Sequence, residues 1–268
     1  MENVGSGFQN ADSDIFDRLV NCLDFMNDLS WFKEYKTHSW QSLEIKQDQL
    51  VLDVGCGTGS DLIQLAKQYN KTDFIGIDKS KSFLSIARER AASLSNIQLL
   101  QGNSQQLPLS DGSVNSTRID RSLQHMDDPL CVMKEMRRVT KKGGKIVSCE
   151  PDWETFILFN GELNNSSKMS QLFKQSIRNP FIGRELAWLM AQCRIENISI
   201  TSHAFVTRNF SEASIIFDLG KLHHQCVENE ILTREEADNW WSQSEHASKQ
   251  GYFFAALNII ETVGAITN

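Results

Sequence analysis

A glycine-rich loop with an acidic neighbour is the part of this sequence whose residue types and spacing best suit ligand chemistry. In VLDVGCGTGSDLIQLA, residues 51–66, an apolar run reaches Asp53 and then a loop that contains Gly55, Gly57 and Gly59. Glycine turns between a strand and a helix commonly hold nucleotides, because backbone amides at the helix N-terminus face the ligand. The G-x-G-x-G spacing differs from the G-x-G-x-x-G of dinucleotide loops. The Asp53 carboxylate would repel a pyrophosphate, so the loop favours a ligand that carries an ammonium group.

Polar residues also follow the next two apolar segments. Asp78 ends the segment DFIGID and Lys79 follows it; we expect both to contact the ligand, and the Asp78 carboxylate can accept hydrogen bonds from both hydroxyls of a ribose. Asn103 and Ser104 follow IQLLQG, where the Asn103 amide oxygen can accept from an adenine amino group and the Ser104 N–H can donate to the ring. Asp78 could instead cap the next helix, and Asn103 could form a turn. Together these groups describe an adenine, a ribose and a cationic amino-acid tail, and S-adenosylmethionine fits.

Consecutive motifs make the sequence similar to the class I S-adenosylmethionine-dependent methyltransferases. LDVGCGTG resembles the glycine motif of that family, GID its ribose acid and LPLSDGS its loop after the third strand; LQHMDDPLCVMKEMRRVTKKGGKIVSCEPD resembles the part from the fourth-strand loop to the fifth strand. The resemblance covers residues 50–152. It is closest to the branch with the ubiquinone/menaquinone C-methyltransferases and many small-molecule methyltransferases of secondary metabolism. The sequence departs from the family at Asn103, where aspartate is commoner, and at Val114-Asn115, which replaces Phe-Asp.

This resemblance implies an enzyme that uses S-adenosylmethionine to methylate an O, N or C atom of a small-molecule acceptor and releases S-adenosylhomocysteine. Methyl transfer from a sulfonium is an in-line displacement, in which alignment of the reacting atoms can contribute about 7–11 kcal/mol. A base is needed where the nucleophile must lose a proton. His125 is the first candidate base, because imidazole titrates near neutrality, although a structural role suits it equally. Asp120 and Arg121 can orient the substrate or one another, and Asp120 is also expected to contact the cofactor.

Alternating apolar and amphipathic segments must position these residues. We expect an α/β fold, in which strands alternate with helices and form a parallel sheet covered on both faces. The predicted strands are 50–55, 73–78, 97–103, a fourth within 116–126, and 145–151, and the helices between them are 61–70, 80–94 and 129–140, the last of which stops at Gly143-Gly144. The resemblance implies a Rossmann-like sheet of seven strands in the order 3-2-1-4-5-7-6, with strand seven antiparallel.

The flanking parts are predicted to be largely helical. Aromatic residues at helical spacing predict two or three short helices within residues 14–45. Further helices are predicted at 153–180, 183–193 and 211–248, and strands at 196–208 and 252–267. We therefore expect one structural domain with an N-terminal helical cap (1–45), an S-adenosylmethionine-binding core (46–152), and a part that completes the sheet and adds lid helices (153–268).

The helical lid is expected to cover the carboxyl edge of the sheet, where ligands of open parallel sheets bind. Glu150, Asp152 and Trp153 lie at that edge after the fifth strand. Together with Asp120, the two acids disfavour a strongly anionic acceptor unless Arg121 offsets them. Lys36 could meet the cofactor carboxylate, although a surface position is the commoner one for lysine. Several aromatic residues could form apolar walls, although packing in an ordinary helical core is the commoner role: Phe16, Trp31, Trp40, Trp188, Trp240 and Trp241.

Composition argues against several classes of partner. The formal net charge of -7 argues against nucleic acid, because that binding relies on basic residues that meet phosphates. No apolar run approaches the roughly 18 residues of a membrane helix. The six cysteines have no C-x-x-C spacing, so we expect reduced thiols in a cytoplasmic protein. We expect no metal site, because adjacent His223 and His224 would point in different directions on a helix and no third ligand is evident. The N-terminal helices could form either a lid or a homodimer contact.

Alternative functions remain open at the level of the sequence. An S-adenosylmethionine-binding protein of the same fold could act as a cyclase or a regulatory subunit. A nicotinamide-dependent oxidoreductase is disfavoured by the glycine spacing and by Asp53. A non-enzymatic binding module would be expected to have degenerate glycines or to lack the ribose acid at Asp78, and the sequence keeps both features.

Overall fold

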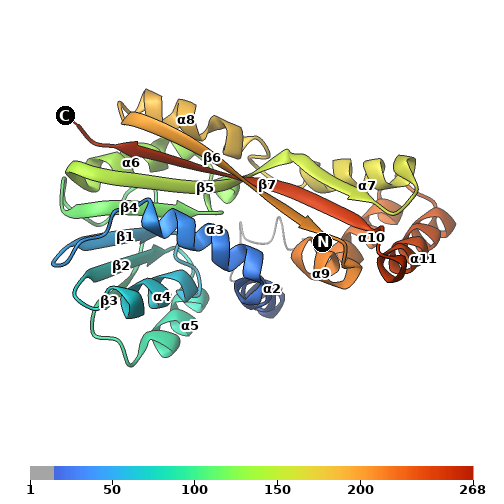
Figure 1. Ribbon diagram of the computed structural model, residues 1–268, viewed down its shortest axis with the longest axis horizontal. Coiled ribbons are helices and arrows are strands. Elements are labelled where there is room, and N and C mark those ends of the chain that lie inside the picture. Colours follow the sequence, from blue (N-terminus) through green and yellow to red (C-terminus); the bar gives the residue numbers. More distant parts are fainter. Residues whose placement is uncertain (1–14, 268) are drawn as a thin grey trace.

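A seven-stranded sheet runs through the whole molecule (Figure 1), which we describe from a computed structural model that covers residues 15–267. Its strand order is β3-β2-β1-β4-β5-β7-β6. Neighbouring strands are parallel from β3 to β5, whereas β7 is antiparallel to both β5 and β6. The seven-stranded, mostly parallel α/β fold is confirmed. The strands are β1 (Leu50–Val54), β2 (Asp73–Asp78), β3 (Ile97–Gln101), β4 (Val114–Asp120), β5 (Thr140–Phe159), β6 (Glu196–Thr207) and β7 (Phe254–Ala265).

Helices cover both faces of the sheet, because alternate residues of each central strand point to opposite sides. In β1, Val51 belongs to one apolar core and Leu52 to the other. Phe74 and Ile75 of β2 divide in the same way. The core that contains Val51 packs against α3 (Ser30–Gln41), α4 (Ser60–Gln68) and α5 (Lys81–Ala91), and the second core packs against α6 (Pro129–Val139) and α8 (Ile182–Gln192).

Helix α6 ends earlier than the sequence predicts. Its first turn is capped by Asp128, whose carboxylate accepts a hydrogen bond from the Cys131 N–H at 2.9 Å. The helix stops at Val139 rather than at Gly143-Gly144, and Thr140 already pairs with Val114 of β4. The prediction was wrong here because sheet pairing begins before the glycines, so they lie within β5 instead of ending the helix.

The prediction of a helix from residue 153 is also wrong at its start. β5 continues to Phe159, and Ile157–Phe159 pair with Phe254–Ala256 of β7 after an irregularity in the register. Antiparallel pairing with β7 therefore overrides the local pattern, which has no strict alternation. The helix α7 begins at Leu163. Glu162 caps it, because the Glu162 carboxylate accepts hydrogen bonds from two N–H groups of the first turn.

The long β5 and β7 strands extend beyond the rest of the sheet, and α7 (Leu163–Gln175), α9 (Phe210–Ile216), α10 (Leu219–Glu228) and α11 (Arg234–Gln250) gather around this extension (Figure 1). The helices predicted at 183–193 and 211–248 are confirmed, as are the strands predicted at 196–208 and 252–267. The predicted N-terminal helices are confirmed as α2 (Phe16–Asp28) and α3, while residues 1–14 of the predicted cap lie outside the described residues.

The first described helix, α2, packs against α9, which lies almost 200 residues later in the chain. Arg18 forms an ion pair with Asp218, and the Cys22 Sγ lies 3.6 Å from the Ile215 carbonyl oxygen. The N-terminal helices and the helices after β6 therefore form one continuous cover beside the sheet. Within residues 15–267, no helix combines the length and the apolar character that a bilayer crossing requires.

Candidate functional site

A deep pocket opens at the carboxyl ends of β1, β2 and β4 and continues under the helical cover. It contains nearly all of the residues that the sequence identifies as site candidates. Gly59 is the exception, because it caps α4 and packs toward α5 instead of lining the pocket. The predicted site residues that line the pocket are Asp53, Gly55, Gly57, Asp78, Lys79, Asn103, Ser104, Asp120, Arg121 and His125.

The glycine loop has a backbone that other residues rarely adopt. Gly55, Gly57 and Gly59 have φ values of 69°, 53° and 75°, which lie in the left-handed region that glycine occupies without steric penalty. A Cβ on Gly55 would lie 2.5 Å from the Ser122 Oγ, so the loop also needs glycine in order to approach the segment after β4. The loop is thus fixed beside the pocket by backbone conformation and by close packing.

Asp78 and Asn103 each have a structural partner and still face the pocket. Asp78 accepts hydrogen bonds from the Gly57 N–H and the Ser80 N–H, each at 2.9 Å, and burial raises its pKa. Ser80 caps α5, because its Oγ accepts a hydrogen bond from the Phe83 N–H in the first turn of that helix. The Asn103 Oδ1 accepts from the Gln105 N–H at 2.9 Å. Carboxylate and amide oxygens have more than one acceptor position, so these contacts leave room for a ligand.

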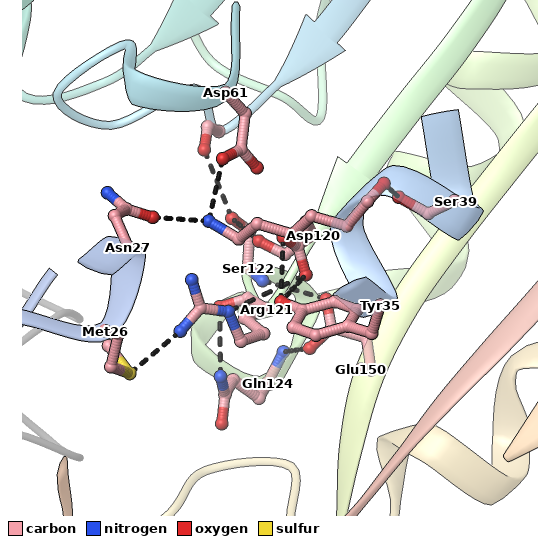
Figure 2. A network of polar contacts seen from close by, with 12 residues as sticks. Met26, Asn27, Tyr35, Ser39, Asp61, Asp120, Arg121, Ser122, Gln124 and Glu150 are labelled. Carbon is pink, nitrogen blue, oxygen red and sulfur yellow. Dashed lines mark hydrogen bonds and ion pairs between the residues drawn. The ribbon is translucent and has the colours of Figure 1, made fainter. Parts of the chain in front are cut away.

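A group of charged side chains from α3, α4, β1 and β4 and the residue after β4, called here the ionic cluster, lines the pocket, and Figure 2 shows three of its members, Asp61, Asp120 and Arg121. Arg118 of β4 is at its centre: one guanidinium nitrogen donates to Asp61 at 2.7 Å and to Asp120 at 2.8 Å, and the other lies 3.1 Å from Asp53. Lys36 of α3 donates to Asp61 at 2.7 Å. The ionic cluster consists of Lys36, Asp53, Asp61, Arg118, Asp120 and Arg121, that is, three basic and three acidic residues.

The environments of two acids in the ionic cluster, Asp53 and Asp61, shift their pKa values in opposite directions. Burial raises the pKa of Asp53 to about 7, although the Arg118 guanidinium opposes this shift. Burial would raise the pKa of Asp61 too, but the charges of Lys36 and Arg118 outweigh it and hold that pKa well below its usual range. Asp61 is therefore a fixed anion, whereas the charge of Asp53 near neutral pH responds to what occupies the pocket.

Some members of the ionic cluster are not predicted from the sequence. Arg118 and Asp61 were not among the candidates, and Lys36 is buried rather than at the surface. A signal for Arg118 was available, since a charged residue within a strand expected to be covered on both faces, two positions before Asp120, has to find buried partners on the same face of the sheet. Tyr35 was also missed; its hydroxyl donates to Asp120 at 3.0 Å.

His125 lies in the short 3-10 helix η2 (Leu123–His125) after β4 and lines the pocket. Burial lowers its pKa to about 3, and the positive charges of Lys79 and Arg121 act in the same direction. The imidazole is therefore neutral at physiological pH. Such a group can accept a hydrogen bond, but its low basicity makes it a poor match for proton abstraction near pH 7.

The two acids after β5 are tied to other parts of the protein. Glu150 accepts hydrogen bonds from the backbone N–H groups of Ser122 at 2.8 Å and Leu123 at 2.7 Å, and it thereby holds the segment after β4. Asp152 accepts from Arg184 at 2.9 Å. Glu150 and Asp152 are not among the described residues that line the pocket. These two acids should therefore repel an anionic acceptor less than the sequence suggests.

The far side of the pocket is an apolar chamber with aromatic walls. Trp153 and Phe173 have ring centroids 5.1 Å apart, and the Arg121 guanidinium carbon lies 5.2 Å from the centroid of the Phe32 ring. Trp153, predicted to lie at the sheet edge, is part of this wall. The six aromatic residues predicted as walls do not occur among the described residues that line the pocket. The chamber residues, which define the aromatic chamber below, are Phe32, Trp153, Phe173, Ile216, Phe217, Leu257 and Ile259.

The six aromatic residues expected as walls have other positions. Trp240 of α11 is buried, and its indole N–H donates to the Ser166 Oγ at 2.9 Å. Trp40 is buried in the core, and 56% of Trp188 is exposed. The prediction was wrong because helical spacing identifies residues that become buried, but it does not show which of them face a cavity.

Comparison with known proteins identifies related sequences and folds. The model of a family described as "Methyltransferase domain" matches residues 45–191. An uncharacterised 37.1 kDa protein of transposon TN4556 from Streptomyces fradiae is 31% identical over 250 residues, which are 92% of this chain and 71% of that protein. The demethylmenaquinone methyltransferase of Staphylococcus epidermidis is 35% identical over 159 residues, 59% of this chain; the match spans 64% of that enzyme, slightly less than two thirds of its length.

A similar fold occurs in solved structures. The geranyl diphosphate C-methyltransferase of Streptomyces coelicolor, crystallised with Mg²⁺, geranyl diphosphate and S-adenosyl-L-homocysteine, aligns with a TM-score of 0.56. The alignment covers 87% of this chain and 79% of that enzyme, at 16% sequence identity. The similarity therefore concerns the fold.

Proposed function

Because the chain belongs to the methyltransferase domain family, we propose that it transfers the methyl group of S-adenosylmethionine to a small-molecule acceptor held in the aromatic chamber. The observation that carries this proposal is the continuity of the pocket. The same pocket includes the glycine loop, Asp78 and Asn103 at one end and the aromatic chamber at the other. A cofactor and an apolar acceptor can therefore meet within one enclosed space, with Arg121 between them.

The polar end of the pocket suits the three parts of the cofactor. Asp78 accepts from the ribose hydroxyls, and Asn103 with Ser104 recognises the adenine. The ionic cluster, with three acids and three bases, suits the methionine tail, which itself carries one ammonium and one carboxylate. The tail ammonium would favour the ionised form of Asp53, whose pKa of about 7 leaves it partly protonated without a ligand.

The apolar end of the pocket would position the acceptor and exclude water. When bound, the cofactor supplies a methyl group on a sulfonium, and its transfer leaves a neutral thioether. The aromatic chamber aligns the acceptor with that methyl, which is the main requirement of a displacement. Arg121 places a positive charge where a hydroxyl or an oxyanion of the acceptor can lie. We propose an apolar acceptor with such an oxygen, and a catalysis that does not depend on His125 as a base.

Isothermal titration tests the cofactor half of this proposal. Wild-type protein should bind S-adenosylmethionine and S-adenosylhomocysteine but not NADH. Asp78→Ala should weaken the binding of both sulfur ligands about 10- to 100-fold, because hydrogen bonds to a charged group contribute about 1.5–3 kcal/mol each. Asp73→Ala is the matched control, since Asp73 is exposed at the opposite end of the same strand. Tight NADH binding without a response to either sulfur ligand would overturn the proposal.

An acceptor assay tests the second half. Formation of S-adenosylhomocysteine is measured with apolar phenols and quinols, beginning with a demethylated naphthoquinol, since a demethylmenaquinone methyltransferase is 35% identical over 159 residues. Turnover with any of them supports methyl transfer to an apolar oxygen-bearing acceptor. Tight cofactor binding without product, over a broad panel of acceptors, would favour a cyclase or regulatory role on the same fold.

The setting of this activity is part of the proposal. All six cysteines are unpaired, which suits the reducing cytoplasm. The net charge of -7 supports a function without nucleic acid. A homodimer through the N-terminal helices stays a prediction, as do the boundaries of the cap, core and lid at residues 45 and 152.

A further inference from the structure

Outside the pocket, three potential metal ligands from three elements converge beside the sheet. His38 of α3, His203 of β6 and Glu261 of β7 are called here the His-Glu cluster. The Glu261 Oε2 lies 2.7 Å from the His38 Nδ1 and 2.9 Å from the His203 Nε2. The three potential ligand atoms all lie within 4.8 Å of one another. The sequence alone does not reveal this group, because 223 positions separate His38 from Glu261.

The ligand set has the chemistry of a zinc site. Two imidazoles and one carboxylate are a common set of three protein ligands for Zn²⁺, with a further position for water or another ligand. A tetrahedral ion with bonds of about 2.1 Å holds its ligand atoms about 3.4 Å apart. The His-Glu cluster therefore needs movements of less than about 1 Å to surround an ion.

The surroundings of the His-Glu cluster support binding further. Glu261 is 1% exposed in a strand that pairs on both sides, so its position is well fixed. Ser42 donates to its other oxygen, Oε1, at 2.6 Å; this contact orients the carboxylate so that Oε2 faces both imidazoles, as outer hydrogen bonds do at metal sites. The His38 side chain is 49% exposed, which provides an entry path and room for a water ligand.

We propose that His38, His203 and Glu261 bind a divalent transition-metal ion, with Zn²⁺ as the ion that best matches the ligands. The ion fastens α3 to β6 and β7. Because α3 also carries Lys36 into the pocket, the metal stabilises the part of the N-terminal cover that closes the cofactor side. The alternative is a metal-free group in which hydrogen bonds from Ser42 and the histidines satisfy the buried carboxylate.

Metal titration of tag-free, full-length protein distinguishes these two possibilities. Zn²⁺ binding is measured by calorimetry, and Co²⁺ is added separately because its visible absorption reports the ligand geometry. We expect one ion per chain and a higher melting temperature with Zn²⁺, since binding to the folded state stabilises it. His38→Ala, which changes a half-exposed side chain and should fold, is expected to weaken binding more than about 100-fold. Ser42→Ala should weaken it about 10-fold, as loss of an outer hydrogen bond commonly does.

A matched control excludes general binding by surface histidines. His224→Ala changes an exposed histidine on α10, and it should leave both the stoichiometry and the affinity unchanged. Glu261→Gln keeps the size of the side chain and should abolish the Co²⁺ absorption. The proposal is overturned if wild-type protein binds no Zn²⁺ or Co²⁺, or if His38→Ala binds as tightly as wild type.

Discussion

At the scale of single residues, burial decides which side chains of the pocket carry charge. His125 is the clearest case, because its pKa of about 3 in the folded protein lies far below the value of 6.5 expected when unfolded. Between these two values the unfolded chain binds a proton at this position and the folded chain does not. His125 therefore reduces stability progressively as the pH falls from about 6.5 toward 3.

We predict that His125→Asn loses less stability on acidification than wild type. Between pH 6.5 and 5 the difference should reach about 2 kcal/mol, since one proton contributes about 1.36 kcal/mol per pH unit. Urea unfolding at pH 7, 6 and 5 measures the slopes of both proteins. His224→Asn, at an exposed position, should keep the wild-type slope. Equal slopes for wild type and His125→Asn would show that His125 titrates normally in the folded protein.

The residue types predicted which side chains line the pocket better than they predicted how the charged side chains pair with one another. Asp53, Asp78 and Asp120 all line the pocket, as expected from strands whose carboxyl ends share an edge. The ion pairs that join Lys36 and Arg118 to Asp61 were not predictable, because the three residues come from α3, β4 and α4 and lie far apart in sequence. Burial of several charges in one place depends on the tertiary fold, which a local pattern does not contain.

At the scale of elements, the glycines of the loop meet two different requirements, space for a ligand and close packing of helices, although they belong to one sequence motif. Gly57 lines the pocket, and a Cβ there would meet no protein atom within 4 Å. A Cβ on Gly59 would lie 3.0 Å from the Ala87 Cβ, where α4 packs against α5. Gly57 therefore leaves space for the ligand, whereas Gly59 allows the close approach of two helices.

We predict that Gly57→Ala mainly weakens ligand binding, whereas Gly59→Ala mainly reduces stability. Gly57→Ala should cost about 1–2 kcal/mol of stability, from its left-handed backbone, and should weaken S-adenosylhomocysteine binding more strongly because the methyl group occupies ligand space. Gly59→Ala should lose more stability than Gly57→Ala and less affinity. Urea unfolding and calorimetry on both proteins measure these quantities. The reverse ranking would mean that Gly57 does not face the cofactor.

Strands and helices were predictable where their hydrophobic pattern was strong, but the residues at which they begin and end were not. The apolar segments of β1 and β2, the alternating segment of β6 and the amphipathic helix α8 formed as expected. The strand β5 continues through Trp153 to Phe159 because β7 offers a partner there, and that partner lies almost a hundred residues later in the chain. Pairing between distant strands is the physical reason why residues 153–159 could not be assigned from their own sequence.

At the scale of the whole molecule, the cover over the pocket combines the N-terminal helices α2 and α3 with helices that follow β6. α2 and α3 contribute Cys22, Met26, Asn27 and Lys36 to the pocket, and α2 also contacts α9. A ligand in the pocket would therefore touch the N-terminal helices and the ends of the strands at the same time. Binding should couple the ligand to the order of this cover.

We predict that S-adenosylhomocysteine slows amide hydrogen exchange in α2 and α3. At a ligand concentration of 100 times Kd, openings that destroy the site become about 100-fold rarer, because binding stabilises the closed form by about 2.7 kcal/mol. Helix α8 is the internal control, since it packs in the core on the opposite face of the sheet. Its locally opening amides should exchange at the same rate with and without ligand. Slower exchange in the glycine loop alone, with α2 and α3 unchanged, would show that the cofactor binds without closing the N-terminal helices over it.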